Sequence, residues 1–355
     1  MRPTRKIRVL IVDDSTIVRK ILSDSLAAEP DLEVVGTAPD PFVARDKILT
    51  LDPDVLTLDI EMPRMDGLTF LKKLMHFHPL PAVVISSLAQ PSCRLALEAL
   101  ALGAVEVLAK PGGPYSVGEL RHSLAGKIRA AAAARVALRP AAAPSLPPAR
   151  VECDAAANAV VAIGASTGGT EAIAAVLQWL PRSTPGVVIV QHIPPAFSRA
   201  FAARLNERSP MEVREAADGD ALRPGLALVA PGDFHMVLRR SQSGRFVSIR
   251  GGPQVCYQRP SVDVLFASVA ETAGPLAVGI LLTGMGSDGA QGLLKMRQAG
   301  ARTIAQDETS CVVYGMPREA VVLGAAEQVL PLSAIPAAIL ARLPRPEPIP
   351  ATAKA

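Results

Sequence analysis

The chain alternates short apolar runs with longer segments of helical periodicity, and this alternation is the strongest constraint on its fold. In the first half, five apolar runs are separated by amphipathic segments. Such runs are typical of parallel strands that helices cover on both faces, because neither face then meets water. The alternation therefore predicts an α/β fold with a doubly wound parallel sheet. The predicted strands are residues 7–12, 32–35, 55–58, 82–85 and 105–108.

A second α/β domain is expected after a segment rich in Ala and Pro. This segment contains the run AAAPSLPPAR, and its prolines prevent a continuous helix, so we interpret it as a semi-rigid linker. An antiparallel hairpin is expected around residues 236–250. The predicted strands are 160–163, 186–190, 227–230, 246–249 and 278–282, and the predicted helices are 170–180, 198–207, 261–273 and 289–299. The expected organisation is a first domain at 5–129, a linker at 130–157, a second domain at 158–344 and a disordered tail at 345–355.

Composition narrows the class of protein. The 355 residues are 49% hydrophobic, which is enough for two ordinary cores. The net charge is +4, and the basic residues are scattered, so we expect no nucleic-acid partner. The first apolar run is too short for a signal peptide or a membrane helix, and we expect a cytoplasmic protein without membrane insertion. Four cysteines lie far apart without a CxxC pair and are expected to be small buried side chains: Cys93, Cys153, Cys256 and Cys311.

Polar side chains stand at the ends of the predicted strands of the first domain. Asp13 and Asp14 follow the first strand and Asp59 follows the third. The carboxyl ends of parallel strands share one edge of the sheet, so these carboxylates should converge there. Three negative charges at close range repel one another unless a cation lies among them, and carboxylate oxygens suit Mg²⁺.

Ser86 and Lys110 follow the fourth and fifth strands of the first domain. A hydroxyl and a positive charge there would hold a phosphoryl group after Asp59 had acted as its nucleophile. For any single aspartate a helix cap or a turn is the alternative interpretation. The joint pattern favours phosphoryl transfer onto a carboxylate.

The second domain has a serine, a histidine and an aspartate at strand ends. Ser166 lies in the segment GASTGG between a strand and a helix, a pattern of either a nucleophile elbow or a phosphate cradle. His192 and Asp288 follow two other strands, so a general base and its orienting acid could meet the hydroxyl. His235 is the competing base. We favour His192, because it directly follows a buried run and two prolines fix its loop.

Acyl transfer also needs backbone donors for the oxyanion. The segment TGMG beside Asp288 offers a flexible backbone, and the N–H groups of Thr167 and Met285 are the predicted donors. No HExxH, Walker A or paired-cysteine pattern competes in this domain, so no cofactor is expected for this reaction.

The first domain resembles a response-regulator receiver domain, which implies a flavodoxin-like fold. The resemblance implies that Asp59 is the phosphorylated residue and that Ser86 and Lys110 form the phosphoryl switch. Receivers usually carry an aromatic residue three positions before the lysine, and this chain has Val107 there. The implied Mg²⁺ ligands are Asp13, Asp14, Asp59 and the backbone carbonyl of Glu61.

The second domain resembles the protein-glutamate methylesterase domain in the segments GASTGG, QHIPPAFSRAFAARLN, APGDFHM, RPSVDVLF, TGMGSDGA and CVVYGMPREA. The resemblance implies a Rossmann-like three-layer fold that hydrolyses glutamate methyl esters and deamidates glutamines on chemoreceptors. It assigns Ser166 as nucleophile, His192 as base and Asp288 as orienting acid, with Thr167 beside them. Asp307 stands where many relatives have Asn.

Together the two resemblances imply a monomeric chemotaxis enzyme whose partners are a histidine kinase and the cytoplasmic part of chemoreceptors. We hypothesise that the receiver covers the esterase crevice until Asp59 is phosphorylated, because the linker between them is short. Two other classes remain as alternatives: a DNA-binding regulator, which would need a basic recognition helix, and a docking module without catalysis.

Overall fold

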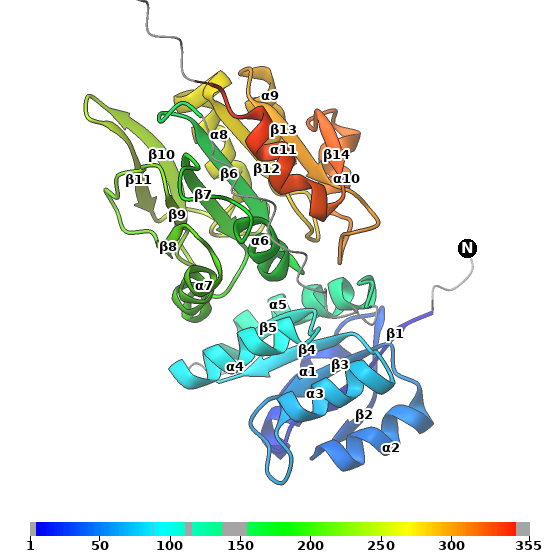
Figure 1. The fold of residues 1–355 in the computed structure, drawn as a ribbon. Helices are drawn as coiled ribbons and strands as arrows, with labels where there is room; N and C mark the ends of the chain where they lie inside the picture. Colours follow the sequence, from blue (N-terminus) through cyan, green and yellow to red (C-terminus); the bar gives the residue numbers. More distant parts are fainter. Residues whose placement is uncertain (1–4, 88, 111–115, 137–154, 346–355) are drawn as a thin grey trace, which may run out of the picture. The chain divides into compact units, whose positions relative to one another are not determined.

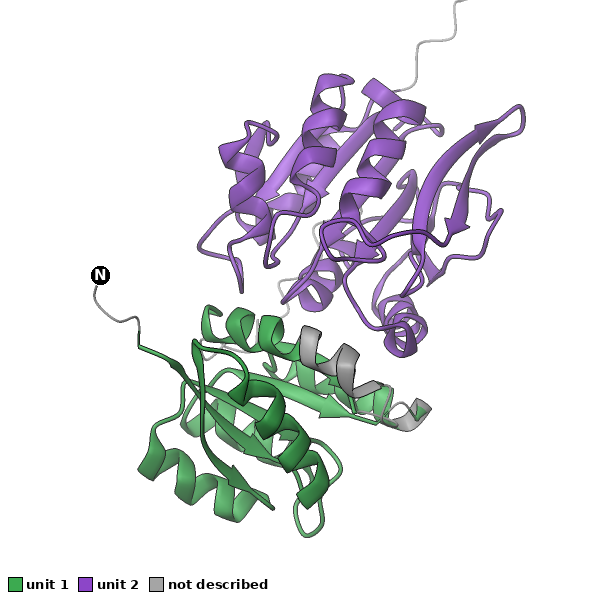
Figure 2. Ribbon diagram, turned by 180° about the vertical axis from the view of Figure 1, so that it is seen from behind, with its two compact units in different colours: residues 1–143 green, residues 144–355 purple. Residues whose placement is uncertain are grey.

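The computed structural model describes residues 5–87, 89–110, 116–136 and 155–345. The chain divides into two compact units, residues 1–143 and 144–355 (Figure 2). Much of the predicted linker and of the tail lies outside the described residues. Each unit is described by itself below.

Unit 1 is a five-stranded sheet in the order β2-β1-β3-β4-β5, and every pairing in it is parallel. This order is that of flavodoxin-like domains, as the resemblance to receiver domains implies, and it is a doubly wound parallel sheet, as the apolar runs predict. The strands are β1 Ile7–Val12, β2 Leu32–Ala38, β3 Val55–Asp59, β4 Ala82–Ser86 and β5 Glu106–Ala109. The helices are α1 Thr16–Ala27, α2 Pro41–Leu51, α3 Gly67–Phe77, α4 Gln90–Ala101 and α5 Ser116–Ala132 (Figure 1).

Burial and helix caps explain why these residues form these elements. All residues of β3 and β4 are buried, which requires continuous apolar runs. Helix α2 begins after Asp40, whose side chain accepts hydrogen bonds from the backbone N–H groups of Phe42 and Val43. Asp66 caps α3 in the same way. These caps fix where α2 and α3 begin, in the loops that follow β2 and β3.

Unit 2 is a seven-stranded parallel sheet in the order β14-β13-β12-β6-β7-β9-β8, with a separate antiparallel hairpin. The parallel strands are β6 Val160–Ala165, β7 Gly186–Gln191, β8 Glu212–Glu215, β9 Leu226–Val229, β12 Ala277–Leu281, β13 Arg302–Gln306 and β14 Gln328–Leu330. The hairpin is β10 His235–Ser241 and β11 Gly244–Arg250. The helices are α6 Gly169–Leu177, α7 Pro195–Arg208, α8 Val262–Ala273, α9 Ala290–Gln298, α10 Met316–Val322 and α11 Ile335–Arg342 (Figure 1).

The α/β class is confirmed, and so is the hairpin. The apolar runs did not predict β8, β13 and β14. β14 has only three residues, and β8 and β14 form the two edges of the sheet, where polar side chains are tolerated. Helix α5 continues to Ala132, beyond the predicted linker start at residue 130, because Ala and Arg favour helix and the first proline comes only at Pro140.

The prediction for the cysteines is only partly right. Cys93 and Cys311 are buried, but Cys256 is exposed. It lies in a tight turn between Val255 and Gln258, outside the strands and helices, with a positive φ of 51°. Cys153 lies outside the described residues. In the described part of the chain, no helix combines the length and the hydrophobicity that a membrane span requires.

Candidate functional site

The acidic cluster of unit 1 forms at the carboxyl edge of its sheet. Asp13 directly follows β1, and Asp59 is the last residue of the neighbouring strand β3. One carboxylate oxygen each of Asp13, Asp14 and Asp59 lie within 4.8 Å of one another. Lys110 Nζ donates to Asp59 Oδ2 at 2.6 Å and lies 3.3 Å from Asp13 Oδ2. The structure thus brings four of the predicted residues together.

Electrostatics in this cluster favour a cation. The pKa of Asp59 is raised to about 6, because burial and the charge of Asp13 outweigh the opposing hydrogen bond and charge of Lys110. Burial also raises the pKa of Asp13. Asp13 Oδ2 is buried, and Lys110 at 3.3 Å is its ion-pair partner. Clustered, largely buried carboxylates, with no histidine or cysteine beside them among the described residues, fit a hard divalent ion such as Mg²⁺.

Ser86 and Glu61 lie at the same edge of the sheet, but their side chains form hydrogen bonds with Ser92. The Ser86 hydroxyl donates to the backbone carbonyls of Ser92 at 3.3 Å and Ser87 at 3.4 Å, and no hydrogen bond to Asp59 is formed. The Ser92 hydroxyl donates to the Glu61 carboxylate, while the Glu61 N–H donates to Asp59 Oδ1 at 3.0 Å. The hydroxyl of Ser86 is thus directed at backbone carbonyls and not at Asp59.

In unit 2, three neighbouring strands carry the serine, the histidine and the aspartate. Ser166 directly follows β6, His192 directly follows β7, and Asp288 lies in the loop between β12 and α9. The Gln191 side-chain amide donates to the carbonyls of Ser166 at 2.8 Å and His192 at 3.1 Å, so one buried group links the two loops. The Ser166 N–H donates to Thr283 O at 3.0 Å, which links the third loop.

His192 is held in one tautomer by Asp288. The distance from His192 Nε2 to Asp288 Oδ2 is 2.8 Å. Asp288 is an acceptor there, so Nε2 carries the proton and Nδ1 carries the lone pair. His192 Nδ1 is buried and has no hydrogen-bond partner among the described residues. The imidazole therefore has one anchored nitrogen and one nitrogen that is free to accept a proton.

Asp288 stays ionised although it is buried. Burial by itself would raise the pKa of Asp288, but the hydrogen bond from His192 and the N–H of Asp263 lower it. Val262 N donates to Oδ2 at 2.8 Å and Asp263 N donates to Oδ1 at 3.0 Å, both from the first turn of α8. A helix N-terminus stabilises negative charge. The Ser261 hydroxyl donates as well, at 2.8 Å, and the sequence patterns did not select this residue.

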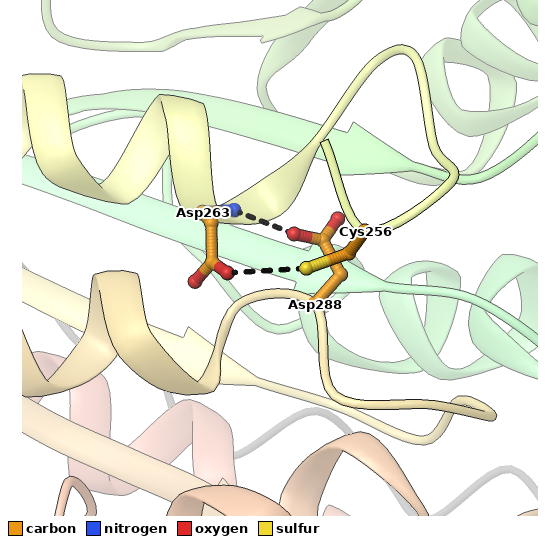
Figure 3. A group of neighbouring side chains, drawn as sticks. All are labelled: Cys256, Asp263 and Asp288. Carbon is orange, nitrogen blue, oxygen red and sulfur yellow. Dashed lines mark hydrogen bonds between the residues drawn. The ribbon is translucent and has the colours of Figure 1, made fainter. Parts of the chain in front are cut away.

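Cys256 and Asp263 adjoin Asp288 (Figure 3). The Cys256 thiol lies 3.8 Å from Asp263 Oδ2, and ligand atoms of the three residues fall within 4.8 Å of one another. Asp263 Oδ1 accepts the N–H of Gly292 at 2.6 Å, and both oxygens of Asp288 accept hydrogen bonds. We infer a hydrogen-bonded frame around Asp288 rather than a metal site.

His235, the competing base, is occupied at both ring nitrogens. His235 Nε2 lies 2.9 Å from the carbonyl of Pro253, and Nδ1 accepts the N–H of Ser261 at 3.2 Å. It begins β10 instead of following a strand, which is why it reaches α8 and not Ser166. His235 therefore has no nitrogen available as a general base.

The turn that carries Ser166 depends on two glycines. Gly168, the N-cap of α6, has φ +76°, which residues with a Cβ rarely adopt, and a Cβ there would lie 2.6 Å from Val312. Gly284 approaches Ser166 so closely that a Cβ would lie 2.7 Å from Ser166 Cβ and 2.3 Å from Met316 Sδ. Thr167 is buried within this turn, and Met285, which follows Gly284, is 41% exposed.

The substitution Gly284→Ala should therefore displace Ser166. We expect ester hydrolysis to fall by at least about tenfold, because a shift near 1 Å is enough to misalign reacting groups. Overpacking should also cost about 1–3 kcal/mol of unfolding free energy. Hydrolysis rates and thermal melting check this, with Gly219→Ala as a control for added volume in open space, although its φ of +84° adds local strain. Wild-type activity in Gly284→Ala would contradict the close approach.

The first domain is doubly wound and carries clustered carboxylates. The second has a parallel sheet with a serine, a histidine and an aspartate at one edge. This combination defines a response regulator with an enzymatic output domain. Residues 9–122 match the family model for the response regulator receiver domain, and residues 161–339 match that for the CheB methylesterase. The chain belongs to the CheB methylesterase family, in the form that carries a receiver domain.

Relatives and a solved structure agree with this assignment. The chain is 57% identical over 333 residues to a protein-glutamate methylesterase/protein-glutamine glutaminase of Syntrophus aciditrophicus, covering 93% of this chain and 97% of the relative. It is 57% identical over 343 residues to one of Anaeromyxobacter dehalogenans, covering 96% of each. The crystal structure of the Thermotoga maritima CheB methylesterase catalytic domain, 36% identical, superposes with a TM-score of 0.51 over 52% of this chain and 99% of that chain. The protein is thus a receiver-linked esterase and amidase.

Proposed function

We propose that Ser166, His192 and Asp288 hydrolyse glutamate methyl esters, and deamidate specific glutamines, on the cytoplasmic part of chemoreceptors. The observation that carries the proposal is the His192–Asp288 hydrogen bond of 2.8 Å, which leaves the lone pair of Nδ1 in the buried loop next to Ser166. In this role the enzyme would act in the cytoplasm, where that part of the receptors lies.

The reaction proceeds by acyl transfer. Ser166 Oγ attacks the ester carbonyl while its proton moves to His192 Nδ1, and the imidazolium is stabilised by Asp288. The N–H groups of Thr167 and Met285 are proposed to bind the oxyanion. The proton then passes from His192 to the leaving methanol, and water hydrolyses the glutamyl-enzyme by the reverse proton movements.

Methanol release from methylated receptor membranes tests this function. Intact protein should release methanol and leave glutamate at the modified positions. Binding to the membranes without methanol release would contradict the proposal and favour a docking module. Tight, salt-dependent binding to DNA would favour a gene regulator, which the parallel sheet and its strand-end site do not suggest.

Control of the esterase is proposed to begin at Asp59. Asp13, Asp14, Asp59 and the carbonyl of Glu61 would hold Mg²⁺, which would neutralise charge on the carboxylates and on a phosphoryl donor. Lys110 already contacts Asp59 and would hold a phosphoryl oxygen. Ser86 would exchange its bond to the Ser92 carbonyl for one to the phosphoryl group. A chemotaxis histidine kinase is the proposed phosphodonor.

Asp59→Asn should abolish this activation. With a small acyl phosphate as phosphodonor and Mg²⁺, we expect the wild-type chain to gain one phosphoryl group and to hydrolyse ester faster. The reason is that phosphorylated Asp59 shifts a closed-to-open equilibrium. Asp59→Asn should gain no phosphoryl group and keep the basal rate. Mass spectrometry and methanol release measure both effects. The control is Asp46→Asn, an exposed carboxylate paired with Arg45. Equal activation of Asp59→Asn and wild type would contradict the assignment.

A further inference from the structure

The first turn of α8 surrounds the carboxylate of Asp288. Ser261 is the N-cap of this helix and is completely buried. Its hydroxyl oxygen accepts the N–H of Val264 at 3.4 Å, and its proton is donated to Asp288 Oδ1 at 2.8 Å. The same hydroxyl therefore caps the helix and binds the acid.

Four donors reach the two oxygens of Asp288. Oδ2 accepts from His192 and Val262, and Oδ1 accepts from Ser261 and Asp263. A carboxylate has about four lone-pair positions, so this set fills it. Apart from His192, Ser261 supplies the only side-chain donor among these four, so it is the part of the frame that mutation can remove without moving the backbone.

His235 holds Ser261 from the opposite side. Because the Pro253 carbonyl can only accept, His235 Nε2 must carry the proton, and Nδ1 is then the acceptor for the Ser261 N–H. His235 is buried at the start of β10. Hydrogen bonds thus run from β10 through Ser261 and Asp288 to His192.

We propose that Ser261 is a positioning residue for ester hydrolysis, a role that rests on the proposed function of Ser166, His192 and Asp288. When the Ser166 Oγ–H bond breaks and the His192 Nδ1–H bond forms, the imidazolium needs Asp288 Oδ2 in place. The Ser261 hydroxyl prevents rotation of the carboxylate about its Cβ–Cγ bond. It also disperses negative charge onto Oδ1, away from the imidazole.

The test is Ser261→Ala, assayed on methylated receptor and on a small activated ester. We expect kcat to fall by about 10- to 100-fold, because even small misplacements of catalytic groups lower rates by such factors. KM should change by less than about twofold, since Ser261 is buried and cannot touch substrate. The acid limb of the pH profile should move to higher pH, because a carboxylate that has lost a donor holds more charge next to His192 and favours the imidazolium. Ser261→Thr, which keeps a hydroxyl, should restore most of the rate.

A matched control separates positioning from stability. Ser268 lies on the same helix, is 8% exposed, and its hydroxyl bonds to Leu265 O and Leu238 N without touching Asp288. Ser268→Ala should lower the melting temperature but keep kcat and the pH profile. If Ser261→Ala does not fold, Ser261→Gly removes the hydroxyl from the cap with little loss of helix stability.

The outcomes distinguish this inference from the proposed function. An unchanged kcat and pH profile in Ser261→Ala, with Ser166→Ala inactive, would overturn the role of Ser261 alone. Equal loss of kcat in Ser261→Ala and Ser268→Ala would also overturn it, because the effect would then be structural. Retained activity in Ser166→Ala would instead overturn the proposed function.

Discussion

Ser166→Ala is expected to lower ester hydrolysis by at least about 10⁴-fold. The substitution removes the attacking oxygen of the proposed mechanism, and with it the hydroxyl proton that His192 would accept. The fold should persist, because no hydrogen bond of the Ser166 hydroxyl to a described residue is lost and its backbone bonds to Thr283 and Gly169 remain. Methanol release from methylated receptor and from a small ester measures the effect.

Ser198→Ala is the matched control for this experiment. Ser198 is buried in the same unit, and its hydroxyl lies 2.5 Å from Glu215 Oε1 and 2.9 Å from Pro195 O. It also accepts the N–H of Gly232 at 3.2 Å, so it connects structural segments and takes no part in the proposed reaction. This variant should keep activity within a few-fold of wild type. Phosphorylation of Asp59 should be the same in both variants. If Ser166→Ala kept more than roughly a tenth of the wild-type rate, Ser166 would not be the nucleophile.

Asp288→Asn should lower kcat by about 10³- to 10⁴-fold. The carboxylate meets donors on both oxygens, so the amide group of an asparagine must point its own N–H bonds at other donors. If the amide faces His192, the ring must turn its lone pair to Nε2 and carry the proton on Nδ1, where it cannot accept the proton of Ser166. In that orientation the N–H of Val262 also loses its acceptor, and if the amide faces Ser261 the N–H of Asp263 loses its acceptor instead. Either orientation therefore leaves one helix donor unpaired, at a cost of about 1–3 kcal/mol.

NMR of the His192 ring nitrogens distinguishes these two states, and thermal melting measures the stability cost. Asp307→Asn is the control, because Asp307 accepts from Ser310 N at 3.0 Å and Thr309 Oγ1 at 2.7 Å in a turn of the same unit. Asp307→Asn should hydrolyse ester at the wild-type rate. A rate within tenfold of wild type for Asp288→Asn, with unchanged ring signals, would remove Asp288 from the mechanism.

Much of the fold and of the strand-end chemistry could be predicted from residue patterns. Continuous apolar runs can be buried only between two layers of helices, so the α/β class follows from β3, β4 and β6 alone. Asp13 and Asp59 were expected to converge because parallel strands end at one edge, and the structure places them together. The short edge strands were missed, since their residues alternate or are polar.

Other features depended on contacts between distant segments. Ser261 was not selected, although a serine before the apolar run VDVLF indicates an N-cap, because nothing local says that its proton is donated to Asp288. His235 and His192 looked alike as residues near strands. Only their partners separate them, a carbonyl and an N–H for one and a carboxylate for the other. Cys256 was expected to be buried, but turn geometry exposes it.

The amino-acid order by itself determined that two parallel sheets form, which loops follow their strands, and which polar side chains those loops carry. These properties follow from local periodicity and from the shared edge of parallel strands. The tertiary structure decided which nitrogen of His192 is anchored, that four donors converge on Asp288, and that Ser86 bonds to Ser92 in this state. Such features require orientation across segments far apart in the chain, where hydrogen-bond geometry and not residue type selects the partner.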